Sequence, residues 1–404
     1  MTKLTPQTVY LDANATTAVD SRVLAAMLPY FTQQFGNPSS KHSLGEAAAA
    51  ATRRARGQLQ KLLGAEKPSE IVFNSGGTEG ANAAILSALE AAPRRREIII
   101  SAVEHPAVLS LCAWLEKHKG IRIHIIPVDQ NGFLDIDAYR RALSDRVAVV
   151  SIMWANNETG VIFPVPELAD LAKETGALFH TDAVQAVGKL PIDLKSTEID
   201  MLSLSGHKFH APKGVGALYL RDAVRFKPQI RGGHQERGRR AGTENVPGIV
   251  GLGVAAELAA THLEEETTRV RALRDRLERG ILDQVKHCVA VGASAERLPN
   301  TSTIAFSFIE GEAIVLLLDR AGIAVSMGSA CSVGSFEPSH VLVAMKVFDE
   351  ALRGAVRFSL SRDNTEADVD RVLDAVPGIV AKLRAISPFG SEEGAPLALD
   401  QAHG

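Results

Sequence analysis

Three polar residues, Ser205, His207 and Lys208, follow directly on the largely apolar run 199–204. That run has the pattern of a buried strand, and an amine at the end of a buried strand is costly unless its charge is paired or lost. A Schiff base with an aldehyde removes the charge and makes a lysine catalytic. The same segment is also compatible with an ordinary surface loop, so its meaning depends on the rest of the chain.

Other chemically useful side chains follow predicted strands earlier in the chain. These strands alternate with helices, which predicts a mostly parallel sheet whose ligands bind beyond the carboxyl ends of its strands. A helix cap or a turn would explain any one of these residues, but several such coincidences favour one shared site. The residues are His105, Asn157, Asp182 and Gln185, and they follow the runs 97–101, 147–154 and 177–180.

A glycine-rich turn after the strand 71–73 opens a predicted helix and contains Gly77 and Thr78. The free backbone N–H groups and the dipole at a helix N-terminus favour a phosphate, and Thr78 adds a hydroxyl donor. No Gly-Lys-Ser/Thr follows, so the turn is not a Walker A motif. Alone, it is a weak sign of a phosphate site.

One ligand, pyridoxal phosphate, accounts for the whole set. Its aldehyde requires a lysine, here Lys208, and its ring nitrogen requires a carboxylate, here Asp182, that keeps it protonated. Its ring face requires a flat partner, for which His105 is the candidate. The predicted donors to its phenolic oxygen and to its phosphate are, respectively, Gln185 and the group Gly77, Thr78, Ser205 and His207.

The three cysteines, Cys112, Cys288 and Cys331, lie far apart in the sequence and form no C-x-x-C spacing. Reactive thiols occupy accessible, polar surroundings, whereas structural cysteines usually lie in apolar elements. Cys331 stands in the small-residue run 326–338, so we expect a flexible loop with a reactive thiol. Cys112 and Cys288 lie in or beside apolar segments, and free thiols fit a reducing cytosol.

The segment 231–245 contains four arginines among several glycines. Its two acidic residues and its lack of aromatic residues argue against RNA binding. We expect an ordered loop that presents cations and Thr243 to an anion, across a subunit boundary. Separately, Arg357 stands in the predicted strand 356–361, where its planar fork suits a substrate carboxylate.

The chain has 404 residues, of which 46% are hydrophobic and 23% charged, and its net charge is −3. The slight acidity argues against a general nucleic-acid or membrane-surface binder. No signal peptide and no apolar run of about 18 residues is evident, so we expect a cytoplasmic protein without a membrane span.

The length predicts two domains. We expect an N-terminal segment, 1–15, that packs with a small domain, and a large cofactor-binding domain, 16–258. The small C-terminal domain, 259–386, has α+β character and carries the cysteine loop, and a flexible tail, 387–404, follows. Helices are predicted at 246–260 and 261–286. The small and polar turn 12–17 is expected to pack near something specific.

These residues together resemble the cysteine desulfurase family of fold-type I pyridoxal-phosphate enzymes. The resemblance covers nearly the whole chain, and the long loop around Cys331 is similar to that of the group with a mobile cysteine loop. The segments 154–159 and 232–245 are most similar to the nitrogen-fixation branch, NifS. The motifs that carry the resemblance are 10–17, 35–40, 104–108, 156–160, 180–185, 205–208, 328–331 and 357–360.

The resemblance implies an α/β fold with a seven-stranded-type, mostly parallel sheet and removal of sulfur from L-cysteine, which gives L-alanine and a persulfide on Cys331. It implies catalytic roles for Cys331, Lys208 and His105, and a carboxylate site formed by Arg357 and Asn157. No metal is implied in the catalytic site, although Cys331 could ligate a transient iron-sulfur cluster.

The partners implied are a second copy of the chain, whose Thr243 reaches the neighbouring site, and an iron-sulfur scaffold protein that accepts sulfur for the assembly of nitrogenase-related clusters. The sequence departs from the family pattern at Gly80, Ala81 and Met327.

Two alternatives to this function stay open. One is another fold-type I enzyme, a selenocysteine lyase or an aminotransferase, although an aminotransferase needs no cysteine loop. The other is a non-catalytic sulfur carrier or scaffold.

Overall fold

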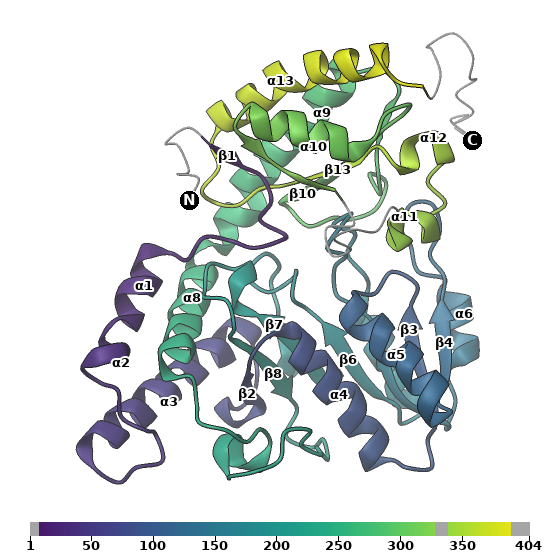
Figure 1. Cartoon of the computed structure of the whole chain (residues 1–404). Coiled ribbons are helices and arrows are strands. Elements are labelled where there is room, and N and C mark those ends of the chain that lie inside the picture. Colours follow the sequence, from purple (N-terminus) through teal and green to yellow (C-terminus); the bar gives the residue numbers. More distant parts are fainter. Residues whose placement is uncertain (1–7, 328–337, 389–404) are drawn as a thin grey trace.

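The computed structural model describes residues 8–327 and 338–388 (Figure 1). Cys331 and most of the predicted cysteine loop, as well as 389–404, therefore lie outside the described residues. The described chain forms a larger and a smaller α/β unit, with the smaller one stacked at one end of the larger sheet (Figure 1).

The larger unit is built on a seven-stranded sheet with the order β2-β8-β7-β6-β5-β3-β4. Only β8 runs antiparallel to its neighbours; the other pairs are parallel, which confirms the predicted mostly parallel sheet. The strands are β2 (Ile71–Asn74), β3 (Glu97–Ser101), β4 (Arg122–Ile126), β5 (Val147–Ser151), β6 (Leu178–Asp182), β7 (Met201–Ser205) and β8 (Gly216–Leu220).

Hydrophobic residues cover both faces of this sheet because side chains alternate along each strand. Ile98 and Ile100 belong to one buried cluster, and Ile99 between them belongs to the other. Helices α4 and α5 cover the first face, and α7 and α8 cover the second, with α3 packed on α8. Their bounds are α3 (Ser43–Leu63), α4 (Gly77–Ala91), α5 (Pro106–Lys119), α7 (Val165–Glu174) and α8 (Val246–Glu265).

The smaller unit has a four-stranded antiparallel sheet, of order β12-β13-β10-β9, covered by three helices. Its elements are β9 (Cys288–Ala290), β10 (Thr301–Phe306), β12 (Ser326–Met327), β13 (Ala355–Ser359), α9 (Arg271–Gln284), α10 (Gly311–Arg320) and α13 (Glu366–Ala385). The side chains of Thr365 and Asp368 form a capping box at the start of α13.

The N-terminal segment reaches the smaller unit (Figure 1). Its strand β1 (Val9–Tyr10) pairs in parallel with β11 (Ile323–Ala324), and Val9 and Leu11 are buried in the smaller core. The remaining short helices are α1 (Ser21–Met27), α2 (Pro29–Thr32), α6 (Ile136–Ala142), α11 (His340–Ala344) and α12 (Asp349–Leu352).

One continuous helix joins the two units, where two separate helices were predicted. It runs from α8 through a π-helical turn, Glu266–Val270, into α9. The prediction of a break was wrong because no glycine or proline interrupts the chain there, and a π turn can re-aim the apolar stripe without ending a helix. The helix is long and apolar enough to cross a membrane. However, its apolar part, α8, is packed on α3 and the sheet, as a core helix would be.

Candidate active site

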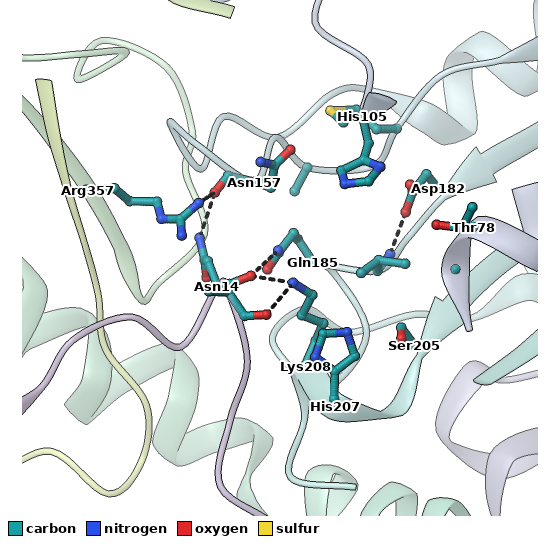
Figure 2. A pocket seen from close by; sticks show the side chains of 15 residues that line it. Asn14, Thr78, His105, Asn157, Asp182, Gln185, Ser205, His207, Lys208 and Arg357 are labelled. Carbon is teal, nitrogen blue, oxygen red and sulfur yellow. Dashed lines mark hydrogen bonds between the residues drawn. The ribbon is translucent and has the colours of Figure 1, made fainter. Parts of the chain in front are cut away.

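A cavity lies beyond the carboxyl ends of the central strands. Its volume of about 340 Å³ suits a small ligand. It brings together residues from the larger sheet, the N-terminal segment and β13 of the smaller unit (Figure 2). The sequence-predicted residues that line it are Gly77, Thr78, His105, Asn157, Asp182, Gln185, Ser205, His207, Lys208 and Arg357. Their placement is a fact of the structure, whereas their chemical roles stay predictions.

Lys208 ends a single 3₁₀ turn that follows β7. Its Nζ donates hydrogen bonds to the main-chain oxygens of Asn14, at 2.6 Å, and Ala15, at 2.8 Å. Both oxygens come from the N-terminal segment, which therefore fixes the direction of the lysine side chain. The amine is presented at the wall of the cavity, where an aldehyde could reach it (Figure 2).

Asn14 is a site residue that the sequence reasoning did not select. Its Nδ2 donates to the main-chain oxygen of Asn157, at 3.1 Å, and to Thr301 Oγ1, at 2.8 Å. Its main-chain oxygen also accepts a hydrogen bond from Gln185 Nε2, at 3.0 Å. The small and polar turn 12–17 was a signal of close packing, but nothing in it specified a partner for a lysine.

Asp182 ends β6 and is buried, with 7% of its surface exposed. Its Oδ1 accepts the N–H of Val184 at 2.9 Å. Burial raises the pKa of this carboxyl, although that hydrogen bond and the nearby His105 and Lys208 oppose the rise. A carboxylate in this position gains from a cationic or N–H donor placed in the cavity.

His105 is the N-cap of α5, and its Nδ1 accepts the N–H of Ala107 at 3.1 Å. The neutral ring must therefore carry its proton on Nε2. Burial lowers the pKa of His105, although the charge of Asp182 opposes this change. The lowered pKa keeps the ring neutral at physiological pH. Figure 2 shows the imidazole and Lys208 on opposite sides of the cavity.

Glu104, the neighbour of His105, is fully buried and was not predicted as a site residue. Its Oε1 accepts hydrogen bonds from Ser101 Oγ, at 2.6 Å, and from the N–H of Met153, at 2.9 Å. Its Oε2 has no partner among the described residues. Burial raises the pKa of Glu104 to about 8, so this carboxyl is protonated at neutral pH.

Thr78 and Ser205 lie at the side of the cavity away from Arg357 (Figure 2). Gly77 is the first residue of α4, and a Cβ there would lie 2.5 Å from a methyl group of Val184, so only glycine fits. His207 adds a ring whose pKa burial lowers to about 4. This side combines a helix N-terminus with two hydroxyl groups, which suits a phosphate.

Arg357 reaches the cavity from β13 and is 2% exposed. Its Nη1 donates to the main-chain oxygen of Asn157, at 3.0 Å, and its Nη2 pairs with Asp12 Oδ1, at 2.8 Å. Its buried Nε has no hydrogen-bond partner within residues 8–327 and 338–388. A guanidinium has five N–H donors, and each Nη group keeps a second hydrogen beyond these two bonds, so Arg357 can also offer a fork to a substrate carboxylate.

One described residue of the predicted site is not brought to the cavity. Thr243 is exposed in the segment 231–245 and does not line the cavity. Cys331 lies outside the described residues. Part of the positive charge of that segment is used within the chain, because Arg240 pairs with Glu79 and Arg231 pairs with Glu90, each at 2.9 Å.

Comparison with known proteins agrees with this arrangement. The family model described as aminotransferase class-V matches residues 9–372. A cysteine desulfurase from Gluconacetobacter diazotrophicus is 68% identical over 381 residues, which are 94% of this chain and 95% of that protein. The cysteine desulfurase NifS from Azotobacter vinelandii is 60% identical over 386 residues, 96% of each chain.

A solved structure described as a NifS-like protein superimposes with a TM-score of 0.87 at 39% identity, and the match covers 93% of this chain and all of the other. The high TM-score shows that the solved structure and this chain share one fold, which agrees with the predicted fold-type I architecture. The chain therefore belongs to the aminotransferase class-V family and, within it, to the cysteine desulfurases.

Proposed function

We propose that this protein uses pyridoxal phosphate to take sulfur from L-cysteine, which yields L-alanine and a persulfide on Cys331. The observation that carries the proposal is the convergence of Lys208, Asp182 and Arg357 on one cavity. The amine and the buried carboxylate follow neighbouring strands of the larger sheet, and the guanidinium comes from β13 of the smaller unit. All three line the same ligand space.

The residues present fit pyridoxal phosphate. Asp182 is a buried carboxylate whose charged form needs a donor from the cavity, which a protonated ring nitrogen would provide. Gly77 begins α4, and the free N–H groups at this helix N-terminus favour a phosphate. Lys208 supplies the amine, and His105 supplies a neutral flat ring on the facing wall.

Bound there, pyridoxal phosphate supplies an electron sink that makes the carbon atoms of an attached amino acid acidic. Lys208 would take the proton from the substrate α-carbon as general base. It would then deliver a proton as general acid, moving protons between the substrate α-carbon and the cofactor carbon. Arg357 binds the substrate carboxylate through its fork, and Asn157 lies beside that position. His105, whose Nδ1 accepts the N–H of Ala107, would share the proton of its Nε2 with the substrate sulfur.

The sulfur transfer balances without an external oxidant. The thiolate of Cys331 attacks the substrate sulfur, so an S–S bond forms while the C–S bond breaks. The electron pair of the C–S bond stays on carbon, which takes up a proton and becomes the methyl group of alanine. The enzyme sulfur is oxidised to a persulfide as the substrate carbon is reduced.

The two described cysteines are poor candidates for this attack. Burial raises the pKa of the Cys112 thiol to about 12 and that of the Cys288 thiol to about 11. The thiolate is the nucleophile, and both groups stay protonated at neutral pH. This supports the assignment of the attack to Cys331.

We further infer that the persulfide sulfur passes to an iron-sulfur scaffold protein in the cytoplasm, in the service of nitrogenase clusters. The support is the 60% identity with the relative named NifS. We also infer a homodimer in which Thr243 completes the phosphate site of the neighbouring chain. Its support is that Thr243 is exposed and away from the cavity of its own chain.

The decisive experiment is an absorbance spectrum of the purified protein before and after L-cysteine is added, with sulfide and alanine measured together. We expect a visible cofactor band that changes on addition, and equal amounts of sulfide and alanine in the presence of a reductant. A colourless protein that binds no pyridoxal phosphate would refute the proposal. Selenide release that greatly exceeds sulfide release from matched substrates would favour the selenocysteine lyase instead.

A further inference from the structure

Lys189 is a buried lysine that none of the steps above uses. It is 5% exposed and lies in the turn that follows β6, four residues after Gln185. Its Nζ donates hydrogen bonds to the side-chain Oε1 of Gln185, at 3.1 Å, and to the main-chain oxygen of the same residue, at 3.2 Å. Both contacts of this lysine are therefore directed at one residue of the cavity wall.

These contacts decide which end of the Gln185 amide faces the cavity. An ammonium group has only donors, so Lys189 requires the oxygen of the amide on its own side. The amide nitrogen then points the other way, where one of its two hydrogens is donated to the main-chain oxygen of Asn14 at 3.0 Å. The second hydrogen is left for the cavity, which Gln185 lines.

The same carbonyl of Asn14 also accepts from Lys208 Nζ, at 2.6 Å. A continuous chain of hydrogen bonds thus runs from Lys189 through Gln185 and Asn14 to Lys208. If the amide were reversed, its oxygen would face the oxygen of Asn14, and two acceptors would meet in a buried place. The reversed amide would also replace the oxygen that accepts from Lys189 by an N–H₂ group, so Lys189 and Asn14 both disfavour that alternative.

The surroundings of Lys189 act on its pKa in opposite directions. It borders a small hollow beneath Lys208, and burial lowers the pKa of Lys189 to about 7, while Glu266 opposes that change. Glu266 stands at the start of the π-helical turn, and its own pKa is raised by burial to about 7. The other charged or titratable side chains around the hollow are Lys208, His210, His262 and Arg362.

We propose that Lys189 is a positioning residue that fixes the amide of Gln185 with its N–H₂ group toward the cavity, as a donor to an oxygen of the bound cofactor. The inference rests on the proposed function, because it presumes that pyridoxal phosphate occupies the cavity. It adds a residue that touches neither cofactor nor substrate and acts only through Gln185.

The test is a double-mutant cycle of Lys189→Met and Gln185→Ala, measured on cofactor-loaded protein. The readout is the pH midpoint of the change in the visible absorption of the bound cofactor, together with the dissociation constant for pyridoxal phosphate. A donor to the phenolic oxygen favours its anionic form, so Lys189→Met should raise the midpoint by about one pH unit. Gln185→Ala should raise it at least as much.

The cycle separates orientation from charge. Lys189→Met should have no further effect in the Gln185→Ala background, because the group it positions is then absent. A shift that persists in that background would show that the lysine acts by its charge alone and would overturn the proposal. An unshifted midpoint in the single variant would overturn it as well. Lys189→Arg, which keeps the donors, should restore the midpoint in part.

Controls keep the result interpretable. Lys195→Met removes an exposed lysine six residues farther along the chain and should leave the midpoint unchanged. If Lys189→Met does not fold, Lys189→Gln takes its place in the same cycle. Failure of the unmutated protein to bind pyridoxal phosphate would count against the proposed function. A normal spectrum with additive shifts would count only against the role of Lys189.

Discussion

The Nζ atom of Lys208 lies 2.6 Å from the main-chain oxygen of Asn14, a residue 194 positions earlier in the sequence. The lysine is thus held by backbone from the N-terminal segment. Neither carbonyl oxygen carries a full counter-charge, so both contacts can be released when the lysine is drawn to a cofactor aldehyde.

Lys208→Ala should abolish covalent attachment of the cofactor, because the amine that forms the linkage is removed. Borohydride treatment followed by peptide mass spectrometry should find the reduced cofactor on Lys208 in the unmutated protein and on no lysine in the variant. Lys195→Ala, at an exposed lysine, is the matched control and should label normally. Labelling of a different lysine in the unmutated protein would show that Lys208 is assigned wrongly.

Cys331→Ala should bind cofactor and still change its spectrum with L-cysteine, but should release almost no sulfide. Cys112→Ala and Cys288→Ala should keep most of the activity, because burial holds both thiols protonated. Sulfide release, measured under identical reductant for the three variants, checks this. Full sulfide production by Cys331→Ala would rule out the persulfide mechanism.

Arg357→Lys should raise KM for L-cysteine by about 10- to 100-fold, because a hydrogen bond to a charged group contributes about 1.5–3 kcal/mol. The arginine fork bonds Asn157 and Asp12 and still offers a donor to the substrate, and a lysine cannot keep this geometry. Steady-state kinetics give the result, with Arg353→Lys, at an exposed position, as control. An unchanged KM would place the carboxylate site elsewhere.

Mixing Lys208→Ala chains with Thr243→Ala chains tests the shared site. In a heterodimer one site lacks both groups, whereas the other has its own lysine and the threonine of its partner. At limiting cofactor, activity should therefore exceed the mean of the two parents after verified subunit exchange. Sedimentation that finds a monomer at micromolar concentration, or no gain in activity, would contradict the shared site.

Glu104→Gln should change how stability depends on pH. The folded protein keeps the carboxyl protonated up to a pKa of about 8, whereas the unfolded chain releases the proton at the ordinary carboxyl pKa. Between these values the folded state binds more protons, so stability falls as pH rises, by up to about 1.4 kcal/mol per unit. Between pH 6 and pH 8, the free energy of unfolding should fall less for Glu104→Gln than for the unmutated protein, as measured by urea unfolding. Glu116→Gln, at an exposed position, is the control and should behave like the unmutated protein. Parallel curves for all three proteins would contradict the buried proton.

Much of the fold follows from local patterns. The helix Ser43–Leu63 ends at Gly64, whose backbone is left-handed, and a glycine after a helical run is a clear stop signal in a sequence. Strand ends were less exact: Val147–Ser151 was expected to reach position 154. The continuous helix across positions 260 and 261 was missed, since a π turn leaves no compositional mark.

The site was predictable where one residue carries its own chemistry. Lys208, Asp182 and His105 stand at strand ends, and a parallel sheet gathers those ends at one edge. Asn14 was missed because its role depends on main-chain oxygen atoms, which every residue has. Glu104 does not line the cavity, and its raised pKa could not be predicted because burial causes it and burial is a property of the fold.

The hydrogen bond from the N–H of Asn14 to Ser359 Oγ joins positions 345 residues apart. A chain emerges from the ribosome N-terminus first, and its domains fold as they become available. The N-terminal segment must then wait, without its partner, while almost all of the remaining chain is synthesised. The wall that holds Lys208 is therefore complete only after almost the whole chain has been synthesised, and we expect cofactor loading to follow translation.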